Sequence, residues 1–213
     1  MLDIPFAQIF IVLIVLLFSL TVHEASHAWT ADRLGDPTAR LLGRVSLNPL
    51  VHVDPIGTIV FPLIAAISGA PLIGWAKPVP VSVGRLGHPR RDYMIVAAAG
   101  PASNLVLALV AATVLRLLTI TPVTLGEASI SAPVASLLSR MRYVNVLLAV
   151  FNMIPIPPLD GGNVLSGLLP RSLVPTFNLI RPYGFMLLYA LMLTGTLSVL
   201  VGPPYTFITS WLP

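Results

Sequence analysis

The chain contains no cysteine among its 213 residues, and only 9% of them are charged. Without cysteine there is no disulfide, no thiolate ligand and no cysteine nucleophile, so a metal site must use histidine, aspartate or glutamate. A soluble domain carries about 25% charged residues. The low charge, a hydrophobic content of 56% and a mean hydropathy of +0.91 therefore predict a polytopic integral membrane protein.

Two further absences limit the kinds of membrane protein that the sequence can encode. No tandem or inverted repeat is visible, and the first apolar stretch lacks the basic start of a secretory signal. That stretch is also longer than the apolar core of such a signal, about 15 residues at most, so we expect a retained helix. The net charge of +4 comes from short basic clusters between apolar segments. This pattern is typical of membrane topology, and we expect a lipid bilayer as surroundings and no nucleic acid partner.

Four apolar stretches are long enough to cross a hydrocarbon core, which takes about 20 residues. They cover residues 5–34, 92–120, 135–160 and 183–201. The stretch 56–74 is interrupted by glycine and proline and has basic residues on both sides, which favours a re-entrant segment over a crossing. The expected fold is an all-α polytopic membrane protein with about four transmembrane helices, this re-entrant segment and a small membrane-associated β element. A single domain is expected over residues 1–213.

The basic residues indicate the orientation of these spans. Seven of them lie between the first span and the span at 92–120, and positive charge concentrates on the cytoplasmic side. The scheme accounts for nine of the twelve basic residues, and Arg140 and Arg142 are among the three that it does not fit. We therefore expect a multi-pass protein of the cell membrane, such as a bacterial inner membrane, with the end of the first span on the cytoplasmic side.

That end carries the motif HEASH, in which three ionisable residues follow a long apolar run. Positions i and i+4 share one face of a helix, so His23 and His27 can direct two imidazoles at one zinc ion. Glu24 then lies beside the metal as a general base for water. The alternative is that the histidines lie at the membrane interface with Glu24 as an ion-pair partner. Ionisable groups within a span favour the functional interpretation.

A catalytic zinc ion needs a third protein ligand. Nine other acidic or histidine residues are available: Asp3, Asp32, Asp36, His52, Asp54, His88, Asp92, Glu127 and Asp160. Asp160 is favoured, because it follows an apolar span at the same depth as HEASH and precedes two glycines. His52 and Asp54 remain the second choice.

Two segments, 41–47 and 78–83, have β-compatible sequences and flank the re-entrant stretch. They are the candidates for the small β element, which could pair with an extended substrate. The alternative is that both are ordinary loops.

Three motifs together resemble the site-2 protease family of intramembrane zinc metalloproteases. They are HEASH, then GPASN at 100–104, then NMIPIPPLDGG at 152–162. The resemblance extends to about residue 170 and is nearest to the compact bacterial branch without a PDZ domain. The connector 121–134 is also too short for such a domain.

The resemblance implies a zinc cofactor held by His23, His27 and Asp160, with Glu24 as the base. Asn104 and Asn152 are implied near the site, where they would position the substrate or stabilise the oxyanion. The family often has arginine after its D-G-G or D-G-S sequence, but Asn163 occupies that position here. Single-span membrane proteins are the implied substrates, cleaved within or beside their transmembrane segments.

Two other classes stay open at this stage. Buried histidine and aspartate also occur along the pathways of ion or solute transporters, although no inverted repeat supports this. An inactive scaffold would keep the fold, although it would not need Glu24.

Overall fold

The structure, a computed structural model, describes residues 6–61, 63, 64, 75–120 and 131–213. Within these residues every regular element is a helix. The α-helices are α1 Phe6–Arg33, α2 Thr38–Leu41, α4 Pro89–Ile120, α5 Ser131–Asn152, α6 Asp160–Leu168, α7 Val174–Asn178, α8 Gly184–Leu193 and α9 Thr196–Trp211. Shorter elements are the 3-10 turns η1 Pro49–Val51, η3 Val83–Arg85 and η4 Arg181–Tyr183 and the π-helical turn η2 Pro55–Val60.

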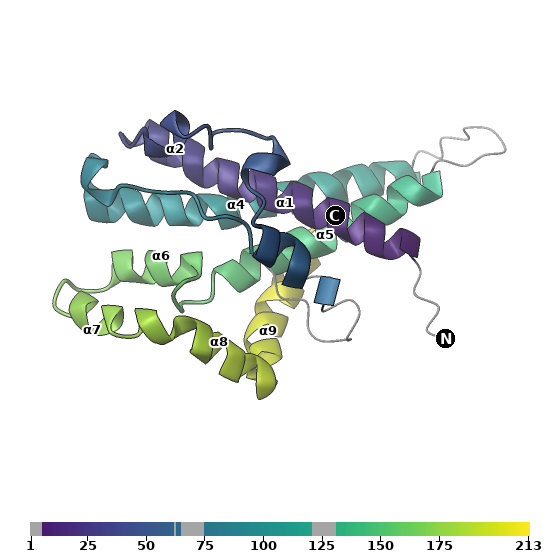
Figure 1. Ribbon diagram of the computed structural model, residues 1–213. Helices are drawn as coiled ribbons and strands as arrows, with labels where there is room; N and C mark the ends of the chain where they lie inside the picture. Colours follow the sequence, from purple (N-terminus) through teal and green to yellow (C-terminus); the bar gives the residue numbers. More distant parts are fainter. Residues whose placement is uncertain (1–5, 62, 65–74, 121–130) are drawn as a thin grey trace.

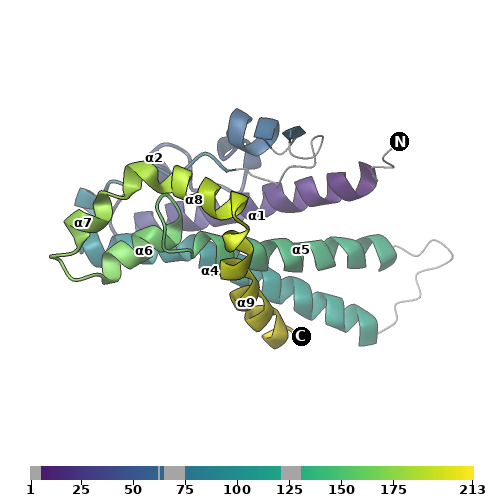
Figure 2. The same cartoon turned by 90° about the horizontal axis from the view of Figure 1, so that it is seen from below.

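Three long helices, α1, α4 and α5, run side by side and form the body of the protein (Figures 1 and 2). All three are long and apolar enough to cross a membrane. A helix suits this setting because it satisfies its backbone hydrogen bonds internally where no water is present. The expected all-α membrane architecture is therefore confirmed.

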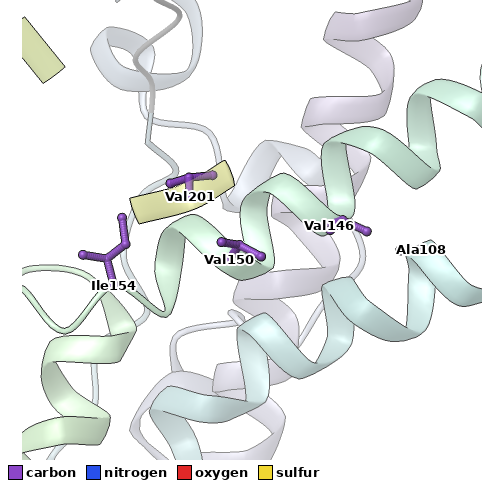
Figure 3. Close-up of a cluster of buried hydrophobic side chains, with 5 residues drawn as sticks. All are labelled: Ala108, Val146, Val150, Ile154 and Val201. Carbon is purple, nitrogen blue, oxygen red and sulfur yellow. The ribbon is translucent and has the colours of Figure 1, made fainter. Parts of the chain in front are cut away.

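Several shorter helices lie toward one end of this bundle. Helix α6 packs against α4, α6 and α7 lie toward the end where α1 ends and α4 begins, and α8 leads from there back to α9 (Figure 1). Helix α9 packs across α5, and a buried cluster joins α4, α5 and α9 (Figure 3). The cluster consists of Ala108, Val146, Val150, Ile154 and Val201.

Two of the predicted spans differ in their limits. The span expected at 135–160 corresponds to α5, which ends at Asn152 because the proline-rich sequence after it cannot continue a helix. The span expected at 183–201 is broken: the helical run Val174–Leu193, which ends with α8, is bent by 84° relative to α9. Gly195 lies between them with φ of 72°, a left-handed conformation that ends α8. The two helices together account for a fourth span only if this bent pair counts as one.

The predicted β element does not form in the part of the chain that the structure describes. Leu41 ends α2, and the residues after it form a turn and bends, while 77–82 has no regular structure. Pro78 and Pro80 have no backbone N–H, so they cannot donate to a strand ladder. The segment 78–83 has the alternating pattern of a strand, but two of its residues lack the N–H groups that a strand ladder needs.

Most of the predicted re-entrant segment, residues 62 and 65–74, lies outside the described residues. Its two ends meet, however. The Trp75 amide donates to the Gly57 carbonyl (3.1 Å), and the Thr58 hydroxyl donates to the Trp75 carbonyl (2.9 Å). A Cβ at Gly57 would lie 2.5 Å from the Trp75 indole, so only glycine allows this approach. The chain therefore returns at Trp75 to the place it leaves at Gly57.

A buried carboxylate holds the loop after α1. Asp36 is fully buried and accepts hydrogen bonds from the amides of Thr38 (3.1 Å) and Ser82 (2.6 Å). Burial alone would raise the pKa of Asp36, but these bonds and nearby Arg85 outweigh it and lower the pKa below its usual value. The carboxylate thus joins the end of α1 to the segment before α4.

We expect Asp36→Asn to lower the free energy of unfolding by about 1–3 kcal/mol, because an amide N–H₂ would face a buried donor. Since the folded pKa is depressed, the ionic contribution is complete above the unfolded pKa of about 3.9 and is lost as the pH falls through the folded value. Thermal melting of both proteins between pH 7 and pH 3 measures this. A melting difference that grows on acidification would contradict the assignment.

Candidate metal centre

Three side chains converge where α1 passes α6. His23 and His27 lie one turn apart on α1, and both are buried. Their Nε2 atoms are 3.0 Å apart, and the Asp160 Oδ2 atom lies 3.1 Å from the first and 3.4 Å from the second. These are the residues that the HEASH motif and the search for a third ligand singled out, and within the described residues they form the single cluster suited to a metal ion.

Asp160 reaches this position through a tight turn between α5 and α6. It is the first residue of α6, and Gly161 and Gly162 follow it, both buried. A Cβ at Gly161 would collide with the carbonyls of Met153 and Ile154. The absence of side chains at these glycines lets α6 fold back against the end of α5, which brings the carboxylate to α1.

Each imidazole is held in its orientation by a hydrogen bond at Nδ1, while its Nε2 atom faces the cluster. His23 Nδ1 lies 2.6 Å from the Asn104 side-chain oxygen, and His27 Nδ1 lies 2.7 Å from the Val96 backbone carbonyl. A carbonyl only accepts, so His27 carries its proton on Nδ1. Its Nε2 then presents a lone pair to the cluster, as metal-binding histidines do.

A chain of amides assigns the proton of His23 in the same way. Asn145 Nδ2 donates to the Met141 carbonyl (2.9 Å), which fixes the direction of the Asn145 amide. The Asn145 oxygen then accepts from Asn104 Nδ2 (2.8 Å), so the Asn104 oxygen faces His23 and must accept from it. His23 is therefore protonated on Nδ1 as well, with Nε2 free to bind.

Asn145, which is fully buried in α5, was not predicted from the sequence. It also donates to the Ser19 hydroxyl (2.9 Å), and Asn104 donates to the Ser19 carbonyl (3.4 Å). The available signal was a lone asparagine in an apolar span, which is costly unless it is bonded and points to function.

The cluster has the chemistry of a cation site. In neutral imidazoles with their protons on Nδ1, two lone pairs and a carboxylate oxygen face one another with no proton between them. Asp160 Oδ2 is buried and has no hydrogen-bond donor. Ligands bound tetrahedrally at 2.0–2.1 Å would be about 3.3 Å apart, close to the separations found here. The three residues therefore fit a zinc ion.

Gly100, in the GPASN motif of α4, faces the same cluster. A Cβ there would lie 2.6 Å from the His23 Nε2 atom and would also collide with His27 Nε2. Glycine at this position keeps the space in front of the two nitrogens open.

Glu24, between the two histidines in sequence, is half-buried and accepts a hydrogen bond from the Val79 amide (3.1 Å). Its carboxylate is thus held by the extended segment after Trp75. This partner was not predicted, because it comes from a loop distant in sequence.

The other candidate residues have structural contacts. Asn152 donates to the Leu148 carbonyl of its own helix (3.0 Å). His52 is buried with Nε2 on the Ser46 carbonyl (2.8 Å), and Asp54 accepts from the Ile56 and Gly57 amides at the start of η2. Neither belongs to the metal cluster.

Asn163, at the position where the family often has arginine, accepts from the Arg181 guanidinium (3.0 Å). Arg181, which belongs to η4, thus brings a guanidinium group to the Asn163 side chain.

Comparison with known proteins agrees with this geometry. Residues 11–194 match Peptidase family M50. "Putative zinc metalloprotease YwhC" of Bacillus subtilis is 35% identical over 190 residues, which covers 89% of this chain and 83% of that protein. "Putative zinc metalloprotease Rip2" of Mycolicibacterium smegmatis is 34% identical over 187 residues, or 85% of this chain and 66% of that protein. The Rip2 protein of Mycobacterium tuberculosis strain H37Rv is 32% identical over 199 residues. No solved structure matches.

The family match covers most of the chain, and it confirms the resemblance drawn from the three motifs. The transporter and scaffold alternatives are not favoured. This chain belongs to peptidase family M50, the site-2 protease family, and is an intramembrane metalloprotease with zinc as its cofactor.

Proposed function

We propose that His23, His27 and Asp160 hold the catalytic zinc ion and that Glu24 is the general base for peptide-bond hydrolysis. The observation that carries this is the convergence of three metal-binding atoms, within 4.8 Å of one another, next to Glu24. Two imidazoles and one carboxylate leave a fourth position for water, as in catalytic zinc sites.

A bound zinc ion at this site would supply Lewis acidity, which polarises the scissile carbonyl and makes water more acidic. Glu24 takes a proton from the attacking water and delivers it to the amine that leaves when the C–N bond breaks. The Val79 amide keeps the Glu24 carboxylate in one orientation while this proton moves.

Asn104 acts on His23 in this proposal and does not contact the substrate. Its oxygen and its amide nitrogen are engaged with His23, Asn145 and Ser19, so neither is left to stabilise an oxyanion. Asn152 is likewise bonded within α5. The asparagine of GPASN therefore orients a ligand.

The substrates we propose are single-span membrane proteins, cleaved near the cytoplasmic face of a cell membrane. The site lies at the end of the bundle where α1 ends, and the basic loop that contains α2 is at the same end (Figure 1). We also propose that 56–74 is re-entrant, because Gly57 and Trp75 are hydrogen-bonded neighbours. A substrate helix must unwind locally before its carbonyl can reach the site.

The first test separates metal binding from catalysis. We expect Glu24→Gln to keep zinc and to lose at least about 100-fold in cleavage of a model transmembrane substrate, because the base is gone. Asp160→Asn should lose zinc, whereas Asp32→Asn, which alters an exposed partner of Arg40, should keep both zinc and activity. Zinc content by mass spectrometry and gel-based cleavage measure these outcomes. Equal activity of Glu24→Gln and wild type would refute the mechanism.

A second test uses the glycine that faces the cluster. We expect Gly100→Ala to reduce bound zinc sharply, since the methyl group would occupy the space before both Nε2 atoms. Gly202→Ala is the matched control, because a Cβ at Gly202 meets no atom within 4 Å. Zinc stoichiometry after purification compares them, and full zinc in Gly100→Ala would argue against the placement of the ion.

A third test addresses the amide chain. We expect Asn145→Ala to weaken zinc binding by about 10- to 100-fold, because loss of a partner that orients a ligand has this effect. Asn145→Asp keeps an acceptor for Asn104 and should be affected less. Competition with a chelating dye measures the affinity, and an unchanged affinity in Asn145→Ala would show that α5 does not orient His23.

A further inference from the structure

One buried cation near the site has no role in the mechanism so far. Arg44 is only 6% exposed, and its Nη2 donates to the Lys77 backbone carbonyl. Its Nε is buried without a hydrogen-bond partner. Among the described residues no carboxylate lies within ion-pair distance of it. A buried charge without a close partner is costly, so its retention calls for an explanation.

The turn after α2 directs the Arg44 side chain into the protein. Helix α2 ends at Leu41, and Gly43 adopts φ of 69°, the left-handed conformation that glycine favours. The Arg44 amide then returns to the Ala39 carbonyl (2.8 Å). Arg40, four residues earlier, instead pairs with Asp32 at the surface. Two arginines of one short segment thus have opposite environments.

The carbonyl that Arg44 binds belongs to the segment that holds Glu24. Lys77 accepts from Arg44, and its own amide donates to the His52 carbonyl (2.8 Å). Two residues later, Val79 donates to Glu24 Oε2 (3.1 Å). Residues that precede proline favour an extended backbone, in which alternate residues point to the same side. The Lys77 carbonyl and the Val79 amide therefore lie on the same side of the segment, where the first accepts from Arg44 and the second donates to Glu24.

The charges agree with this arrangement. Burial lowers the pKa of Arg44, and the negative charge of Glu24 raises it in the opposite direction. The negative charge of Glu24 thus acts on Arg44, although the two side chains form no ion pair. The guanidinium and the carboxylate are linked through three residues of backbone.

We propose that Arg44 is a positioning residue for the general base: by holding the Lys77 carbonyl, it fixes the Val79 amide that orients Glu24. The proposal rests on the proposed function of Glu24 and concerns a residue outside HEASH, GPASN and NMIPIPPLDGG. It assigns the loop after α2 a part in catalysis that does not involve zinc binding.

The test compares Arg44→Ala and Arg44→Lys with Arg40→Ala as the matched control. We expect Arg44→Ala to keep full zinc and a nearly unchanged KM, while kcat falls about 10- to 100-fold, as when a reacting group is misplaced. Arg44→Lys should recover part of kcat, because lysine can still donate to the Lys77 carbonyl. Arg40→Ala should behave as wild type, since exposed ion pairs contribute little.

A second variant keeps the result decisive if Arg44→Ala folds poorly. Val79→Pro removes the N–H that binds Glu24 and suits an extended backbone, so it should lower kcat by a similar factor. Because both residues act through one contact, the double variant should be no slower than the slower single variant, whereas independent effects would multiply. Wild-type kcat in Arg44→Ala or Val79→Pro, or multiplied effects, would overturn the inference.

The two proposals fail in different ways. If Glu24→Gln cleaves substrate as wild type does, the assignment of the base is wrong. If Glu24→Gln is inactive while Arg44→Ala has wild-type kcat, the base is retained and only the role of Arg44 is refuted.

Discussion

The structure depends on the meeting of two imidazole nitrogens and one carboxylate oxygen that have no proton to share. His23, His27 and Asp160 bring these atoms within 3.4 Å of one another. Such an arrangement is repulsive unless a cation lies among its members, since buried acceptors need a donor or a metal. The surrounding helices have to hold this cluster together and leave room for the ion. Their packing near the site follows from these two requirements.

Each neighbouring helix meets one requirement. Helix α4 passes close to α1 at Gly100, where a side chain would fill the space before the nitrogens. Helix α5 contributes Asn145, whose bond to its own backbone sets the direction of the amide chain that ends at His23. Helix α6 delivers Asp160 from a turn that two glycines allow. The polar groups within these apolar helices are paired with one another, which offsets the cost of placing them there.

The proposed base is held separately from the proposed metal ligands. Glu24 receives its hydrogen bond from Val79, in a segment whose prolines leave few donors and whose carbonyl at Lys77 is bound by a buried arginine. In the proposed mechanism, zinc binding and proton transfer thus depend on different parts of the chain. This separation allows one function to be altered while the other is kept. It also gives a physical role to a loop that a strand-like alternation had suggested was a β element.

The sequence by itself determined the features that follow from local spacing and composition. Three long apolar helices, the shared face of His23 and His27, and the choice of Asp160 could all be predicted, because a helical period and a span length are properties of neighbouring residues. Tertiary structure alone decided the partners: Asn145 donates within α5 and accepts from Asn104, Val79 donates to Glu24, and Arg44 donates to Lys77. Apart from the bond within α5, these contacts join residues far apart in the chain, and only the packing of the helices determines which of them meet.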